Sequence, residues 1–122
     1  MPLLSSPKIW RVKAPLAGLA ASNGLRPGLG MLAKTMADEL GPRNIRVNGL
    51  LPGRIDTDRV RELDGTGAKG RKARTESESR IPLGRYGEPA EFGRVAAFLL
   101  SPAASFVSGT MVPVDGGMMR AI

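Results

Sequence analysis

The chain has 122 residues, with 18 lysines and arginines against 11 aspartates and glutamates, a net charge of +7. It contains no cysteine and no histidine, which excludes disulfides, thiolate nucleophiles and a Ser-His-Asp triad, and we expect no metal site. No stretch approaches the ~20 apolar residues that span a bilayer, and residues 1–20 lack the apolar segment of a signal peptide, so we expect a cytoplasmic protein with no membrane partner.

The first part of the chain predicts one short strand and one clear helix. Residues 8–13 alternate as a strand does. Residues 22–40 predict a helix, because apolar side chains recur there every three or four positions. Pro27 fits only a first helical turn, so the helix starts near residues 23–26 or is kinked there. Gly41-Pro42 ends it, with positive φ at the glycine. The apolar stripe consists of Leu25, Leu29, Leu32, Met36 and Leu40, widened by Ala33 and Ala37.

A strand and a long polar segment follow. Residues 45–51 predict a short strand that ends in the turn Pro52-Gly53. Residues 54–80 are polar, charged and rich in glycine, which favours a long mobile loop with one helical piece at residues 57–63. A basic cluster lies in this segment, at Lys69, Arg71, Lys72 and Arg74.

The last part of the chain predicts a second helix and a second strand. The helix opens at Gly87, takes Pro89 in its first turn and ends at Ser101-Pro102. The strand covers residues 110–114. Because Pro113 lacks a backbone N–H, we expect this strand at the edge of a sheet. The buried face of the helix comprises Phe92, Val95, Ala96 and Leu99.

The order of these elements indicates an α/β fold with a parallel sheet and crossover helices. Two or three strands are few for a parallel sheet that must be covered on both faces. We therefore interpret the chain as the C-terminal portion of a doubly wound fold.

Several separate blocks of sequence resemble the second half of a short-chain dehydrogenase/reductase. They occur in the order and at the spacing typical of that family, and they extend from about Ser22 to the end of the chain. The blocks are Leu32 to Leu40, Gly41 to Asn48, Leu51-Pro-Gly53, Ile55-Asp-Thr57, Ile81 to Pro89, Phe98 to Ser101, Ala104 to Gly109 and Val114-Asp-Gly-Gly117.

The resemblance implies one Rossmann-type domain of about twice this length, which binds NAD or NADP. Residues 1–122 then form a single, partial, truncated domain. Within it, residues 1–15 match poorly and residues 54–80 form the mobile substrate loop. The implied chemistry is hydride transfer between the nicotinamide and a carbonyl or alcohol carbon of a small molecule. The helix at residues 22–40 commonly contributes to a dimer interface in the family, so the resemblance also implies a homo-oligomer.

The family's catalytic pair is a Tyr and a Lys four residues apart on one face of a helix. Family spacing brings these positions to Ser22 and Arg26. A serine hydroxyl is a much poorer acid than a phenol. Arg26 keeps the positive charge and is able to hold ribose hydroxyls, but it does not exchange protons. The family's upstream Ser position falls near Ile9, and the glycine-rich phosphate loop is absent.

The resemblance assigns cofactor contact to Pro52, Gly53, Ile55 and Thr57, together with Arg26. The glycine permits close backbone approach, and the threonine hydroxyl and backbone amides face the carboxamide. A plain turn in which Thr57 caps a helix is the alternative for this segment. For Ser22 and Arg26 the alternative is a helix cap beside a solvated basic residue.

Two charged residues and the basic cluster have no firm assignment from the sequence. We interpret Arg54 and Asp56 as members of surface ion pairs, with substrate contact as the alternative. The cluster at residues 69–74 has no interleaved aromatic residue on which bases would stack, so we expect no nucleic-acid partner. The favoured hypothesis is a fragment of an oxidoreductase, weak or inactive as this chain. The alternative is a non-catalytic assembly or binding protein that uses the helical interface.

Overall fold

The computed structural model describes residues 20–120, with side chains from Leu25 onward. The strand expected at residues 8–13 lies outside this range. The longer helices are α2 (Ala20–Leu40), α4 (Gly67–Glu78) and α5 (Pro89–Leu100). The shorter elements are the 3₁₀ turns Gly41–Arg43 and Pro102–Ala104, the helix α3 (Asp58–Asp64) and the strands β1 (Gly49–Pro52) and β2 (Met111–Val114).

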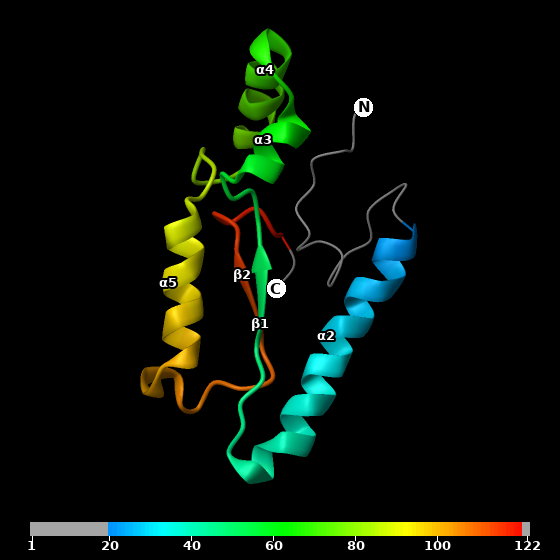
Figure 1. Cartoon of the computed structure of the whole chain (residues 1–122), viewed down its shortest axis with the longest axis vertical. Coiled ribbons are helices and arrows are strands. Elements are labelled where there is room, and N and C mark those ends of the chain that lie inside the picture. Colours follow the sequence, from blue (N-terminus) through cyan, green and yellow to red (C-terminus); the bar gives the residue numbers. More distant parts are fainter. Residues whose placement is uncertain (1–19, 121–122) are drawn as a thin grey trace.

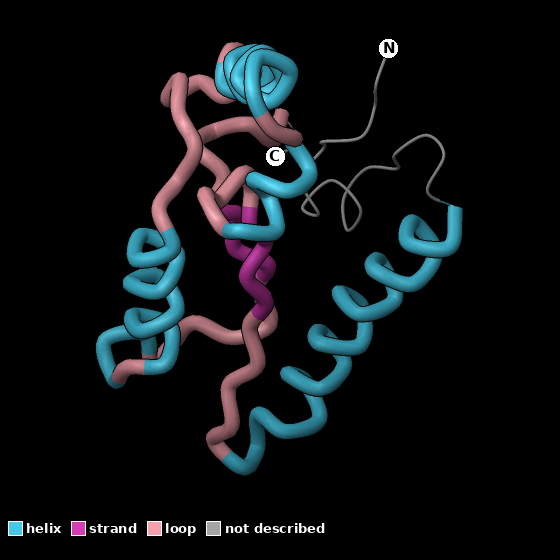
Figure 2. The backbone as a smooth tube through the Cα atoms, turned by 45° about the horizontal axis from the view of Figure 1, so that its top comes forward, coloured by secondary structure: helices cyan, strands magenta, loops and turns pink. Residues whose placement is uncertain are grey.

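The two strands are parallel and run in register from Gly49 opposite Met111 to Pro52 opposite Val114. Figure 1 shows them side by side, with α5 on one side and α2 on the other, and the tilted view of Figure 2 keeps this arrangement. A parallel pair needs a crossover connection, which here contains α3, α4 and α5. The α/β class and the parallel sheet are therefore confirmed.

Helix α2 differs from its prediction at both ends. It is helical from Ala20, and Pro27 lies inside it, so a start at residues 23–26 was wrong. It ends at Leu40 as expected, but the positive φ falls on Asn44, at 58°, after a turn of 3₁₀ helix. Asparagine tolerates this left-handed conformation, so the helix ends without a positive φ at Gly41.

The apolar stripe of α2 is exposed along most of its length in the part of the chain that the structure describes. Ala37 is buried and Leu40 is half-buried. The remaining large side chains of the stripe face outward, and an adjacent methionine joins them. They are Leu25, Leu29, Met31, Leu32 and Met36.

Both strands are shorter than predicted. β1 begins at Gly49 rather than Ile45. The residues just before it are joined to the loop before β2 by a backbone bond from the Gly109 N–H to the Val47 carbonyl and by bonds of side chains. Asn48 donates its amide to the Val107 carbonyl at 2.9 Å and accepts from the Thr110 N–H at 3.3 Å. Within the described range β2 pairs only with β1, and Pro113 is exposed, so the edge position of this strand is confirmed there.

Residues 54–80 are the largest correction to the prediction. The helical piece at residues 57–63 is confirmed by α3, but Gly67–Glu78 is a second helix, not a loop. Most of its residues are good helix formers, and Arg74 pairs with Glu78 at 2.9 Å across one turn. Gly70 allows α4 to pack closely against the segment before it, since a Cβ on Gly70 would collide with the backbone of Gly65.

Helix α5 is confirmed with its predicted C-terminal end and its proline in the first turn, but it begins at Pro89 rather than at Gly87. A capping box of Glu88 and Glu91 satisfies the first backbone N–H groups. At the other end the Arg46 guanidinium donates to the Leu99 carbonyl at 2.7 Å and to the Ser101 carbonyl at 3.3 Å. On the predicted inner face Leu99 is buried, and Phe92, Val95 and Ala96 are half-buried.

Within the described residues no helix is long and apolar enough to cross a membrane. A buried apolar cluster joins Ile81 and Tyr86 of one loop to Met118 near the end of the chain, and Val60 of α3 packs against it. This cluster lies beside the carboxyl end of β1, where the chain turns into α3.

We expect Gly53→Ala to destabilise the chain by about 1–3 kcal/mol, since an added Cβ would lie 2.5 Å from the Asp115 Cα. Gly93→Ala is the matched control. Gly93 lies within α5 with open space around a new Cβ, so this change should stabilise the chain by about 0.5–1 kcal/mol. Urea unfolding of both variants measures the difference. Equal effects would show that the turn after β1 does not need a glycine.

Candidate functional site

The turn after β1 is held from two directions. The Gly53 N–H donates to the Val114 carbonyl of β2 at 2.9 Å. On the other side, Asp56 N–H donates to the Gly87 carbonyl at 2.8 Å, and Gly87 N–H donates to the Arg54 carbonyl at 2.9 Å. The segment from Pro52 to Thr57 is thus fixed at the carboxyl edge of the sheet, where α/β folds bind ligands.

Thr57 is the N-cap of α3. Its hydroxyl oxygen accepts the Val60 N–H at 3.3 Å, and its backbone is extended, with φ of −117°. The capping interpretation of this residue is therefore confirmed. An accepting hydroxyl still has its own hydrogen to donate, so capping leaves Thr57 one donor for a ligand.

Ser22 and Arg26 lie one turn apart near the start of α2, hence on one face of that helix. The Arg26 side chain is half-buried; that of Ser22 lies outside the description. Figures 1 and 2 place the start of α2 toward the same end of the molecule as the carboxyl end of β1.

A buried polar cluster that the sequence did not predict adjoins the turn after β1. Arg54 is 4% exposed, Asp64 9% and Tyr86 3%. The Tyr86 hydroxyl donates to Asp64 Oδ2 at 2.8 Å, and Arg54 Nη1 lies 3.4 Å from Asp64 Oδ1. Arg54 is therefore not the surface residue that the sequence suggested. The three residues lie far apart in sequence, so no local spacing links them.

Tyr86, the one tyrosine of the chain, is held as a neutral donor. Burial raises its pKa above the ordinary value, and the Asp64 carboxylate that accepts its hydrogen bond acts in the same direction. The Arg74 guanidinium lies over its ring, 4.4 Å from the centroid, a cation–π contact.

Asp56 connects the helices α3 and α4 to the turn. Its carboxylate accepts from Arg61 of α3 at 2.8 Å and from Arg74 of α4 at 3.2 Å. The hydrogen bond from Arg61, with that from Arg74, lowers the pKa of Asp56. Asp56 is thus part of an ion-pair network at the surface, as expected, but this network also attaches α3 and α4 to the turn.

The loop that carries Tyr86 is fixed by its neighbour Arg85. Arg85 makes a bidentate pair with Glu91, at 2.9 and 2.7 Å, while Glu91 also accepts the Glu88 N–H at 2.7 Å. These bonds, that from Arg85 first, lower the pKa of Glu91 to about 2.

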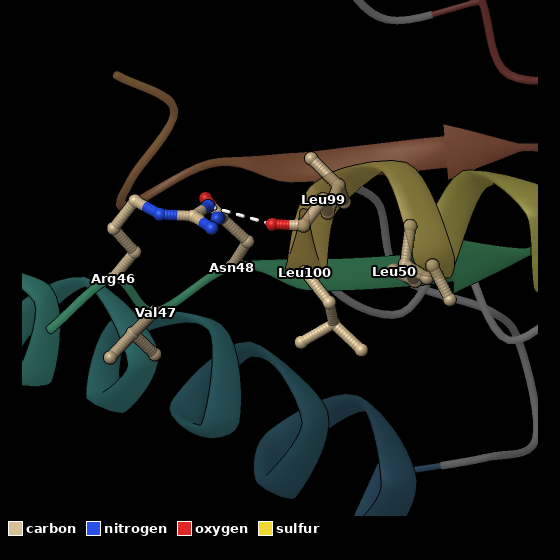
Figure 3. Close-up of a pocket in the computed structure, with 7 residues that line it drawn as sticks. Arg46, Val47, Asn48, Leu50, Leu99 and Leu100 are labelled. Carbon is tan, nitrogen blue, oxygen red and sulfur yellow. Dashed lines mark hydrogen bonds between the residues drawn. The ribbon is translucent and has the colours of Figure 1, made fainter. Parts of the chain in front are cut away.

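A pocket of about 460 Å³ lies at the opposite end of β1, between the amino end of this strand and α5. Figure 3 shows the Arg46 guanidinium turned toward the Leu99 carbonyl, with Leu50 and Leu100 farther along the pocket. Its lining is mostly apolar, and its one charged group already binds carbonyl oxygens. In residues 20–120 no three acidic residues cluster as a metal site would require.

Comparison with known proteins gives one family. The family model described as enoyl-(acyl carrier protein) reductase matches residues 13–119. The 3-oxoacyl-[acyl-carrier-protein] reductase FabG of Thermotoga maritima is 44% identical over 88 residues, which are 72% of this chain and 33% of that protein. A peroxisomal 2,4-dienoyl-CoA reductase of Saccharomyces cerevisiae is 40% identical over 94 residues, 76% of this chain and 30% of that protein.

Solved structures agree with this result. YwfH, an NADPH-dependent reductase involved in bacilysin biosynthesis, superimposes with a TM-score of 0.83 at 36% identity, over 93% of this chain and 44% of that one. An aldohexose dehydrogenase of Thermoplasma acidophilum gives 0.82 at 30% identity, over 91% and 46%. These similarities confirm the Rossmann-type fold. The chain spans about a third of the two curated relatives and under half of these two structures.

We expect Asp64→Asn to destabilise the chain by about 3–5 kcal/mol, because it leaves the buried Arg54 charge without a counter-charge. Glu62→Gln is the control on the same helix: it removes an exposed pair with Arg59, also at 3.4 Å, worth under about 1 kcal/mol. Urea unfolding at neutral pH measures both. Similar small losses would contradict a buried, charge-paired Arg54.

The lowered pKa of Glu91 makes part of the stability depend on pH. Its pKa falls from 4.5 in the unfolded chain to about 2 in the fold, so its contribution is complete above about pH 4.5. The contribution declines below that value and is gone below about pH 2. We expect the stability difference between wild type and Glu91→Gln to follow this course in urea titrations. A difference that does not change between pH 5 and pH 2 would contradict the pairing with Arg85.

Proposed function

The chain belongs to the short-chain dehydrogenase/reductase family, and we propose that it provides part of an NAD(P)-dependent site for hydride transfer to or from a carbonyl or alcohol carbon. The observation that carries this proposal is the rigid turn from Pro52 to Thr57 at the carboxyl edge of two parallel strands. That edge is where such folds receive nucleotides. The similarity to YwfH, an NADPH-dependent reductase, supports a nicotinamide ligand here.

Four residues of the turn face the nicotinamide in this proposal. Pro52 and Gly53 bring the backbone close, Ile55 packs against the ring, and Thr57 uses the hydroxyl hydrogen that capping leaves to it. The bound nicotinamide supplies or takes the hydride. Arg26 holds ribose hydroxyls from the start of α2, on the same face as Ser22.

The proton donor is the least suitable residue of this proposed site. Ser22 stands where the family has a phenol, and a serine hydroxyl gives up its proton far less readily. Tyr86 does not replace it, because its hydroxyl is buried and donates to Asp64. We expect slow or absent turnover from this chain.

A non-catalytic assembly role is the second candidate. The exposed leucines of α2, among them Leu25, Leu29 and Leu32, favour it. Apolar patches of this kind commonly mark protein interfaces. A homo-oligomer through α2 fits both candidates, whereas nicotinamide affinity belongs only to the first.

Calorimetric titration of the 122-residue chain with NADPH and NADH tests the proposal. We expect weak, saturable binding that Arg26→Ala lowers about tenfold or more, since a hydrogen bond from a charged group is lost. Arg43→Ala, an exposed arginine just after α2, is the control and should leave binding unchanged.

Turnover on a panel of aldehydes and ketones completes this experiment. Rapid NADPH oxidation that Arg26→Ala abolishes would contradict the expected weak activity. Absence of any saturable heat would contradict the cofactor site. If no saturable heat is found, a dimer that is detected by sedimentation and dissociated by Leu29→Glu would favour the assembly role.

A further inference from the structure

The Arg54 guanidinium lies 5.7 Å from the centroid of the Tyr86 ring, and it has donors that no residue of the described part of the chain accepts. Its Nη1 lies 3.4 Å from Asp64 Oδ1. Its Nε and Nη2 are shielded from solvent and have no hydrogen-bond partner among residues 25–120, and Asp64 Oδ1 is also without one there. Buried donors of this kind are rare in folded proteins, and each calls for a physical explanation.

The two unused atoms form one geometric unit. Nε and Nη2 lie along the same side of a planar guanidinium, so their N–H bonds point nearly parallel. This arrangement matches the two oxygens of a carboxylate or phosphate, which accept two parallel bonds from it. Asp64 stands at Nη1, so an anion at the other side displaces no existing bond.

Arg54 is placed to meet a ligand of the proposed reaction. It lies between Gly53 and Ile55 of the turn, and its carbonyl is fixed by the Gly87 N–H at 2.9 Å. Among its charged neighbours, Asp56 is already paired with Arg61 and Arg74. Within the described residues, Asp64 is the carboxylate that forms an ion pair with Arg54, and it lies on the Nη1 side.

We propose that the Nε and Nη2 atoms of Arg54 bind the oxyanion of a small-molecule substrate, a carboxylate or a phosphate, next to the turn after β1. The assignment of this anion to a substrate rests on the proposed function. Binding of the anion itself does not, since it needs only Arg54.

Access to Arg54 requires movement of α3 and α4. These two helices contact each other more than any other element, and Figure 1 shows them beyond the carboxyl ends of the strands. Side-chain links attach them to the rest of the molecule: Asp64 to Arg54 and Tyr86, and Arg74 to Asp56. Entry of an anion requires these side-chain links to open while the paired strands stay intact.

Arginine Nε–H resonances in ¹⁵N NMR spectra report this binding directly. The 122-residue chain is titrated with pyruvate, with inorganic phosphate and with chloride at constant ionic strength. We expect one resonance, identified by its loss in Arg54→Met, to shift in a saturable way with pyruvate or phosphate and not with chloride. The resonance of Arg59, on the exposed face of α3, should not saturate.

Arg54→Lys is the decisive variant, because it keeps the charge and removes the paired donors. Titrations of this variant follow the amide resonances of Gly53 and Gly87. We expect at least tenfold weaker binding of the anion. Saturation by pyruvate alone identifies a carboxylate ligand, and saturation by phosphate alone a phosphate.

Two outcomes would overturn the proposal: no saturable shift with either anion, or equal binding in Arg54→Lys. NADPH calorimetry on the same samples distinguishes the anion site from the proposed function. Loss of nicotinamide binding with a retained pyruvate or phosphate response leaves the anion site standing and removes the proposed function.

Discussion

The Asp64 carboxylate is the interaction on which the arrangement of the candidate site depends. It is buried at the end of α3, where it accepts the Tyr86 hydroxyl at 2.8 Å and faces the Arg54 guanidinium at 3.4 Å. A buried carboxylate without partners is costly, so the arrangement depends on both Tyr86 and Arg54. Asp64 thereby joins the end of β1, helix α3 and the loop before α5.

The site segment and the helices above it are attached in different ways. Pro52 to Thr57 is held by backbone bonds to β2 and to Gly87, which do not involve α4. Helix α4 connects to the turn through the half-buried ion pair of Arg74 with Asp56, and its Arg74 also contacts the Tyr86 ring. The edge of the sheet is therefore fixed by backbone hydrogen bonds, whereas α3 and α4 are fixed to it by side chains.

The sequence predicted those parts of the molecule that depend on local patterns. The parallel strands, helix α5 with Pro89 in its first turn and the cap at Thr57 follow from spacing, proline and turn chemistry. Helix α4 was missed because its glycines indicate a loop, whereas Gly70 is needed for contact with the Gly65 backbone. The buried cluster was missed for another reason. Burial of Arg54 is decided by Asp64 and Tyr86, which only the tertiary fold brings beside it.

The environment of Tyr86, the single tyrosine, bears most directly on proton transfer in the proposed reaction. A phenol works as a proton donor in catalysis when its pKa is brought toward the working pH, but burial against Asp64 moves the pKa of Tyr86 upward. Its hydroxyl proton also serves to stabilise a buried charge, so releasing it would leave two anions facing each other. The Tyr86 hydroxyl, the one phenol of the chain, therefore serves to attach α3. Proton transfer at the proposed site would then have to come from Ser22 or from water near Arg26, and both are weaker acids than the tyrosine of the family.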